Sequence, residues 1–220
     1  MKTRFRVGTG LLAGALLVGA VSAWKSDVRV PGERRREEPA SSIRPAGMAW
    51  TSDFETAPAP STLFSAEVWR TLRDADDPGS ECRHTPGDGY DMWSCLFRTT
   101  GRGPRNRDEL SLEMTKYDPR LGESAVEHAA AIFDTAHGTY ADFPVSAPSP
   151  LGDEAFEVPV ESTETRKPHL VTFRARNLIV ELRVTVYREE LDKWELAGER
   201  RRQTWLYATE LSRGLARLHH

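Results

Sequence analysis

The strongest constraint on the fold is a strictly alternating segment, residues 169–187, which reads HLVTFRARNLIVELRVTVY. A turn at Arg176 and Asn177 places residue 175 opposite 178 and residue 171 opposite 182. One side of the hairpin is then entirely apolar, and a slip of one residue would expose the whole set, so we predict this register. The apolar side consists of Val171, Phe173, Ala175, Leu178, Val180, Leu182, Val184 and Val186.

The second side of this hairpin carries Thr172, Arg174, Glu181 and Arg183, together with Ile179. We expect this side to be open or only partly covered by the rest of the chain. Its four polar residues form the candidate binding surface for a partner. Solvated cross-strand charge pairs are the simpler interpretation of each residue taken alone.

The only two cysteines, Cys82 and Cys95, are centred on an Asp88-Gly89 dipeptide. This dipeptide favours a type I′ hairpin turn, which places Cys82 directly opposite Cys95. Counting from the turn puts this pair in the non-hydrogen-bonded class, whose close Cα atoms suit a disulfide, and Pro86 fits the same class. We therefore predict a disulfide rather than two buried thiols. Such a bond persists only outside the reducing cytosol.

The amino terminus has the order of a secretory signal. Three basic residues precede an uncharged run over residues 7–24, and small residues come before a possible cleavage point after Ala23. The run is also close to the shortest length that spans a membrane, so residues 1–24 are either a signal peptide or a membrane anchor. No cysteine lies near residue 20, which excludes a lipid-modified cysteine.

The basic residues after the run conflict with a retained anchor. Lys25, Arg29 and the arginines at 34–36 outnumber the three basic residues before it, which opposes the positive-inside tendency and would leave the domain in the cytosol. The predicted disulfide favours the opposite side of the membrane, outside the cytosol. We give the disulfide more weight and expect an extracytoplasmic protein, either secreted or anchored in the cell membrane.

Composition narrows the class of partner. Of the 30 basic residues only five are lysine, an arginine bias typical of GC-rich genomes such as those of actinobacteria. Without residues 1–23 the chain has 27 basic and 33 acidic residues, so it lacks the basic excess of a nucleic-acid-binding protein. Residues 25–60 are rich in proline and charge and are expected to form a flexible stalk.

We expect residues 61–220 to form one α+β domain. Its predicted architecture is a mostly antiparallel sheet of five or six strands with helices mainly on one face, and one disulfide-closed hairpin. Apolar spacing predicts, besides the two hairpins, a helix capped by Ser65, a strand over 108–118, a helix over 122–136, an edge strand over 154–160 and a closing helix over about 199–218.

Common catalytic and cofactor motifs are absent from the sequence: there is no G-x-S-x-G, P-loop, G-x-G-x-x-G, H-E-x-x-H or C-x-x-C. We therefore expect no catalytic residue, cofactor or metal. His128, on the polar side of its helix, and His137 are not spaced as adjacent ligands. His84 is expected to pack beside Trp93 or lie at the surface, and His169 is expected to titrate in solvent.

Residues 74–81 resemble the start of a calcium-binding loop, because Asp74, Asp76 and Gly79 match positions one, three and six. Position five is Pro78, and position twelve is Thr85, where a bidentate glutamate is needed. A turn after a helix is therefore the favoured interpretation.

Four motifs, "LFSAEVWRTL", "MWSC", "LGDEAF" and "RARNLIVELRV", resemble the uncharacterised exported lipoprotein and sensor-like domains of actinobacterial envelopes. The resemblance covers most of residues 61–218. It implies a binding or sensing domain on the envelope side and carries no catalytic residues. Those relatives usually have a lipid-attachment cysteine, which this sequence lacks, so their mode of anchoring is not carried over.

We therefore expect a non-enzymatic extracytoplasmic binding domain for an envelope protein or small ligand, with no nucleic acid as partner and with membrane contact through the leader if it is retained. One alternative is an exported hydrolase whose carboxylates, such as Asp153 and Glu154, converge only in the fold. Another is a structural component of a cell-envelope complex.

Overall fold

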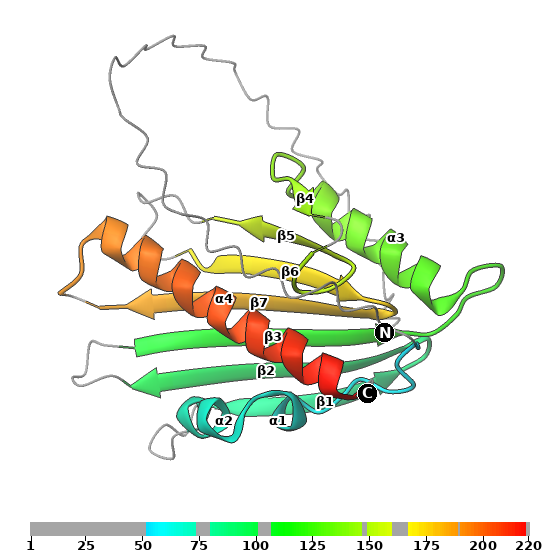
Figure 1. The fold of residues 1–220 in the computed structure, drawn as a ribbon, viewed down its shortest axis with the longest axis horizontal. Helices are drawn as coiled ribbons and strands as arrows, with labels where there is room; N and C mark the ends of the chain where they lie inside the picture. The colour runs from blue at the N-terminus through cyan, green and yellow to red at the C-terminus, as the bar shows by residue number, and fades with distance from the viewer. Residues whose placement is uncertain are drawn as a thin grey trace, which may run out of the picture. The chain divides into compact units, whose positions relative to one another are not determined.

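The alternating hairpin lies near the centre of an antiparallel sheet in a computed structural model. The structure describes residues 52–73, 80–100, 107–146, 149–159, 167–188 and 190–218. The sheet has seven strands, of which six have five or more residues and β4 has two. In spatial order (Figure 1) they are β1 (Glu81–Gly87), β2 (Tyr90–Thr100), β3 (Arg107–Tyr117), β7 (Leu178–Tyr187), β6 (His169–Ala175), β5 (Glu154–Val158) and β4 (Val145–Ser146).

The predicted register of the β6–β7 hairpin is confirmed. Ala175 pairs with Leu178, and Val171 pairs with Leu182. All eight residues of the predicted apolar side are at most 1% exposed. Arg176 has a φ of 56°, which makes it the one described non-glycine residue with positive φ.

The cysteine hairpin also has the predicted register, and Cys82 and Cys95 form a disulfide with Cα atoms 4.0 Å apart. The predicted turn type is wrong. A type I′ turn needs positive φ at both central residues, but only Gly89 has it, with a φ of 83°. This is the sign pattern of a type II turn, which joins the same two strands without changing their register.

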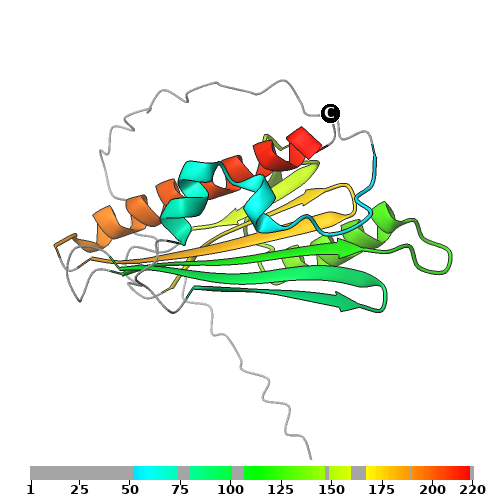
Figure 2. The ribbon, with the colours of Figure 1, turned by 90° about the horizontal axis from the view of Figure 1, so that it is seen from below.

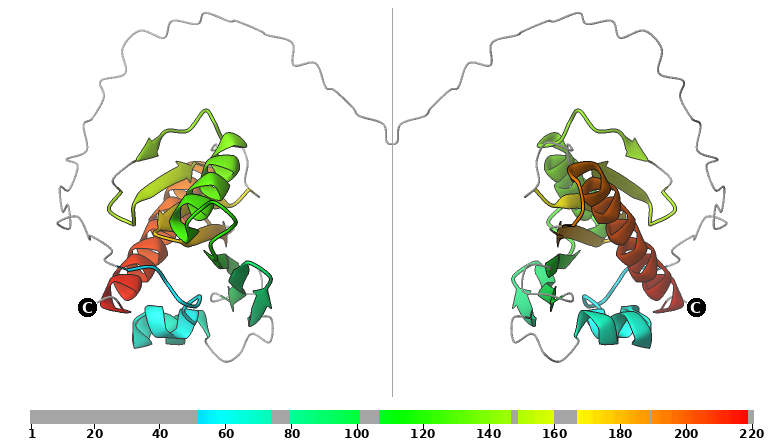
Figure 3. Two further views of the ribbon diagram at one scale, coloured as in Figure 1. Left: turned by 90° about the vertical axis from the view of Figure 1, so that its right-hand side faces the viewer. Right: turned by 90° about the vertical axis from the view of Figure 1, so that its left-hand side faces the viewer.

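Three of the four helices cover the apolar face of the sheet, as Figure 2 shows. They are α1 (Pro60–Leu63), α2 (Ala66–Leu72) and α4 (Lys193–Leu218). Ser65 caps α2 as predicted, because its hydroxyl accepts a hydrogen bond from the Val68 amide at 3.3 Å. Figure 3 shows α1 and α2 beside the C-terminal end of α4, where Arg217 donates to the Leu63 carbonyl at 2.9 Å.

The fourth helix, α3 (Ala125–Gly138), packs on the other face of the sheet. It begins later than predicted, after a capping box in which Ser124 and Glu127 bond each other's backbone amides. Ala129 and Phe133 of this helix contact a second apolar cluster on the sheet, formed by Phe156, Leu170 and Ile179. His128 was expected on the polar side of this helix but is 3% exposed, and its Nδ1 donates to the Asp118 carbonyl at 2.9 Å.

The second face of the β6–β7 hairpin is partly covered, which is one of the two predicted alternatives, and it is not the open binding surface that we expected. Thr172 is 1% exposed and Arg174 is 9% exposed, so two of the four residues of the candidate surface are buried. The alternation of the hairpin distinguishes its two sides but does not show that a helix covers the less apolar one.

The packed domain begins upstream of the predicted boundary at residue 60. Phe54 and Ala57 are 7% and 5% exposed and belong to the main core. The Asn177 side chain holds this segment, because its Oδ1 accepts from the Phe54 amide at 2.8 Å and its Nδ2 donates to the Phe54 carbonyl at 3.0 Å. The expected stalk therefore ends before residue 54.

Two other predicted boundaries shift, and the predicted edge strand is not at the edge. The closing helix α4 starts six residues earlier than expected, at Lys193, because Asp192 accepts hydrogen bonds from the Trp194 and Glu195 amides. Strand β5 ends at Val158, and the two-residue β4 forms the sheet edge beyond it.

Among the described residues, no helix has the length and apolarity needed to cross a membrane. The predicted leader, residues 1–24, and the calcium-loop comparison at 74–79 lie outside the described residues.

Candidate binding pocket

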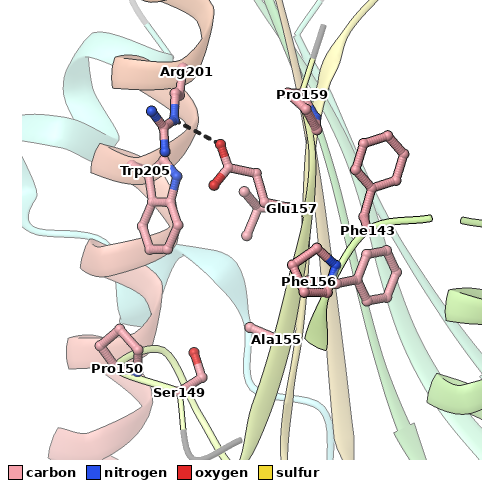
Figure 4. Close-up of a pocket in the computed structure, with 11 residues that line it drawn as sticks. Phe143, Ser149, Pro150, Ala155, Phe156, Glu157, Pro159, Arg201 and Trp205 are labelled. Atoms are coloured by element: carbon pink, nitrogen blue, oxygen red, sulfur yellow. Dashed lines mark hydrogen bonds and ion pairs between the residues drawn. The ribbon is translucent and has the colours of Figure 1, made fainter. Parts of the chain in front are cut away.

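A pocket of about 440 Å³ lies at the β5 side of the sheet, between that strand and α4. Ala155 and Val171 line its floor. Figure 4 shows Glu157 and Arg201 together at its polar end, with Ala155 on β5 below them. The walls and rim are formed by Phe143, Pro144, Ser149, Pro150, Phe156, Pro159 and Trp205. This volume is within the range of small-molecule sites, which are also mainly apolar with a few placed polar groups.

Two pocket residues of β5 are spaced by two and two of α4 by four, so each pair lies on one side of its own element. Ala155 and Glu157 are two apart on β5 and so face the same side of the sheet, and Glu157 pairs with Val171 of β6. Arg201 and Trp205 are four apart on α4 and so lie on one helix face. The packing of α4 on the apolar sheet face therefore places the arginine beside the glutamate.

The opposite wall is a tight loop before β5. Ser149 and Gly152 exchange two backbone hydrogen bonds of 3.2 and 3.3 Å, and Leu151 anchors the loop in the core at 1% exposure. Gly152 permits a close approach, since a Cβ there would lie 2.2 Å from the Arg174 carbonyl oxygen. Phe143 and Pro144 line another part of the pocket. His137 holds this segment, because its Nε2 donates to the Phe143 carbonyl at 2.6 Å.

The Glu157 carboxylate is the centre of the polar end. Its Oε1 accepts two hydrogen bonds, from Arg201 Nε at 2.8 Å and from His169 Nε2 at 2.9 Å. Burial alone would raise the pKa of Glu157, but the bonds from His169 and Arg201 outweigh it and lower the pKa to about 2. Glu157 is therefore ionised at neutral pH. No described residue donates a hydrogen bond to its second oxygen, Oε2.

The Trp205 indole nitrogen adds an unused donor. Nε1 is buried and has no acceptor among the described residues. Figure 4 shows this nitrogen on the edge of the ring that faces Glu157. A buried N–H without an acceptor is unfavourable by about 1–3 kcal/mol, so a ligand that supplies an acceptor gains that difference.

His169 was expected in solvent but is buried. It is 1% exposed and lies under α4 with its Nε2 on Glu157, while its Nδ1 has no hydrogen-bond partner among the described residues. His84 stacks on Trp93 with ring centroids 4.6 Å apart and pairs with Asp91, at the other end of the sheet.

The four residues of the candidate surface are separate from this pocket. Arg174 donates from Nε to Glu154 at 2.5 Å and from NH1 to Asp153 at 3.1 Å, so it forms a structural ion-pair cluster. Thr172 Oγ1 is buried. Only Glu181 and the 49% exposed Arg183 present charge to solvent, and they pair with each other at 2.7 Å.

The two carboxylates considered for catalysis, Asp153 and Glu154, both bind Arg174, and neither is among the described lining residues. Glu157 is the one carboxylate among the described lining residues. No group of three or more His, Cys, Asp or Glu in the described part of the chain is placed to hold a metal ion. The described lining residues therefore offer apolar contact and, at Glu157, Arg201 and Trp205, hydrogen-bonding groups.

Sequence reasoning missed the pocket residues Glu157, Arg201 and Trp205. The spacing of Arg201 and Trp205 places them on one helix face, but nothing local indicates that β5 lies beneath that face. No protein-family model, curated protein or solved structure matches this chain.

Proposed function

We propose that the protein is a non-enzymatic extracytoplasmic domain that binds a small apolar ligand in the pocket between β5 and α4. The observation that carries the proposal is a cavity of about 440 Å³ whose described lining is mainly apolar, with Glu157 and Arg201 at one end. Such a combination is the usual form of a ligand site.

The extracytoplasmic location rests on two features. One is the Cys82–Cys95 disulfide, because most cytosols keep cysteine thiols reduced. The other is the signal-like or anchor-like leader at residues 1–24. The resemblance to actinobacterial envelope domains agrees with this placement and with a sensing or binding role.

The proposal is tested with N-phenylnaphthylamine, a neutral apolar dye whose fluorescence rises in apolar sites. We expect saturable binding to the folded protein with a stoichiometry of one. Ala155→Leu fills the pocket floor, since Ala155 is buried there, and should weaken dye binding by about tenfold or more.

The matched control is Ala131→Leu, the same change at an exposed position of α3 outside the pocket. It should bind the dye like the wild type. Melting temperatures of both variants show that they are folded. Equal dye binding by wild type and a folded Ala155→Leu variant would remove this pocket as the site.

A further inference from the structure

We infer that the pocket selects an apolar molecule whose head group is neutral and both donates and accepts a hydrogen bond, such as a hydroxyl or a primary amide. This inference rests on the proposed function and specifies its ligand class. It follows from the free hydrogen-bonding groups and the charge balance at the polar end.

Among the described residues, the free groups at the polar end are an acceptor on Glu157 and donors on Trp205 and Arg201. Glu157 Oε2 receives no hydrogen bond from a described residue, and the Glu157 side chain is 22% exposed, so a ligand can reach it. Trp205 Nε1–H has no acceptor among the described residues, and Arg201 bonds Glu157 through Nε only, so its terminal N–H groups are further donors. A hydroxyl or a primary amide can donate to Glu157 and accept from one of these donors, whereas a carboxylate can only accept.

The charges disfavour an ionic head group. Glu157 stays ionised at neutral pH because His169 and Arg201 hold its pKa at about 2, so a ligand carboxylate beside Oε2 meets repulsion. A ligand ammonium meets Arg201, whose guanidinium contacts the same carboxylate at 2.8 Å. The ion pair leaves no net charge to compensate a charged head group, which would also lose its water.

The rest of the pocket suits a hydrocarbon body. Beyond Glu157 and Arg201, the described lining residues are apolar or aromatic except Ser149, whose hydroxyl already accepts from the Leu151 amide at 3.1 Å. For ligands with the same hydrocarbon chain, we therefore expect differences in affinity to come from the head group at the Glu157 end.

The test compares four probes with the same chain: octanol, octanamide, octanoate and octylamine at neutral pH. Binding is followed by the indole N–H signals of the tryptophans in nuclear magnetic resonance spectra of the labelled protein. We expect octanol and octanamide to shift the Trp205 signal saturably, with affinities at least about tenfold above those of octanoate and octylamine.

Two tryptophan variants assign the signal. Trp205→Phe should remove the signal that moves, and Trp194→Phe, at a 67% exposed position of the same helix, should leave that signal and its shift unchanged. Glu157→Gln removes the repulsion and should narrow the difference between octanol and octanoate to less than about threefold.

The outcomes separate the two proposals. If octanoate or octylamine binds the wild type as tightly as octanol does, the head-group inference is wrong while the pocket remains a ligand site. If neither the four probes nor N-phenylnaphthylamine binds, the proposed function itself is wrong. The head-group comparison uses the wild-type protein, so it does not depend on the folding of any variant.

Discussion

At the scale of single residues, Glu157 shows how a charge is kept in a half-buried site. It lies at the end of a mainly apolar pocket, where desolvation opposes ionisation. The hydrogen bonds from the buried His169 and the 63% exposed Arg201 more than offset that cost. The carboxylate therefore depends on both partners, and it gives the folded state a pH dependence of its own.

The expected pH dependence follows from the sign of the shift. Because the folded pKa of Glu157, about 2, lies below its ordinary value of 4.5, its stabilising effect is present above pH 4.5 and is lost as the pH falls towards 2. Between pH 6 and 3 we expect the wild type to lose roughly 1–2 kcal/mol of unfolding free energy through this group, after allowing for the exposure of Arg201.

Glu157→Gln should remove this component and flatten the stability profile by that amount. Urea unfolding of both proteins at a series of pH values measures it. Arg183→Ala, which removes an exposed partner of Glu181, serves as a control whose profile should remain close to that of the wild type below pH 4. Parallel curves for wild type and Glu157→Gln would contradict the role given to this carboxylate.

At the scale of elements, α4 is the helix that joins the parts of the domain. It covers the apolar side of β6 and β7, supplies one wall of the pocket, and meets α1 near its own C-terminal end. The contact with α1 is close: a Cβ at Gly214 would lie 2.3 Å from the Leu63 carbonyl oxygen. Gly198 of the same helix is exposed and has no atom within 4 Å of such a Cβ.

These two glycines give opposite predictions for the same substitution. Gly198→Ala should stabilise the protein by about 0.5–1 kcal/mol, because alanine has the higher helix propensity. Gly214→Ala gains the same propensity but must push α1 away, and we expect a net loss of about 2 kcal/mol or more.

Thermal and urea unfolding of the two variants measure the difference. Each variant is the control for the other, because both change the same helix by one methyl group. A stabilising Gly214→Ala would show that α1 does not hold its position against α4.

At the scale of the whole molecule, the sheet order separates the disulfide from the pocket. The β1–β2 hairpin with Cys82 and Cys95 is at one edge, and β5 and β4 are at the other (Figure 1). The crosslink therefore acts on the stability of the fold, and we expect it to have no direct effect on the ligand site.

Replacing both cysteines by alanine should lower the unfolding free energy by about 3 kcal/mol, the value expected for a loop of this size. N-phenylnaphthylamine binding by the folded variant should be unchanged. Reduction of the wild type should reproduce the loss of stability. Protein isolated from its own cells should resist alkylation until it is reduced, and two free thiols in that protein would contradict the extracytoplasmic location.

The sequence by itself determined the two hairpins and their registers. In both cases the signal is local: a period of two in residues 169–187, and two cysteines at equal distances from Asp88-Gly89. The sequence did not determine the turn conformation at Gly89, because two turn types serve the same register.

Only the tertiary structure decided what covers the second face and where the pocket lies. Thr172 and Arg174 are buried on the face where α3 packs, although their alternation with apolar residues is also that of an exposed side. The pocket joins Glu157 to Arg201, which are 44 positions apart in the chain. Periodicity shows which side of an element is apolar, but it does not show which distant element packs on that side. The pocket depends on that packing, because residues of β5, β6 and α4 line it together.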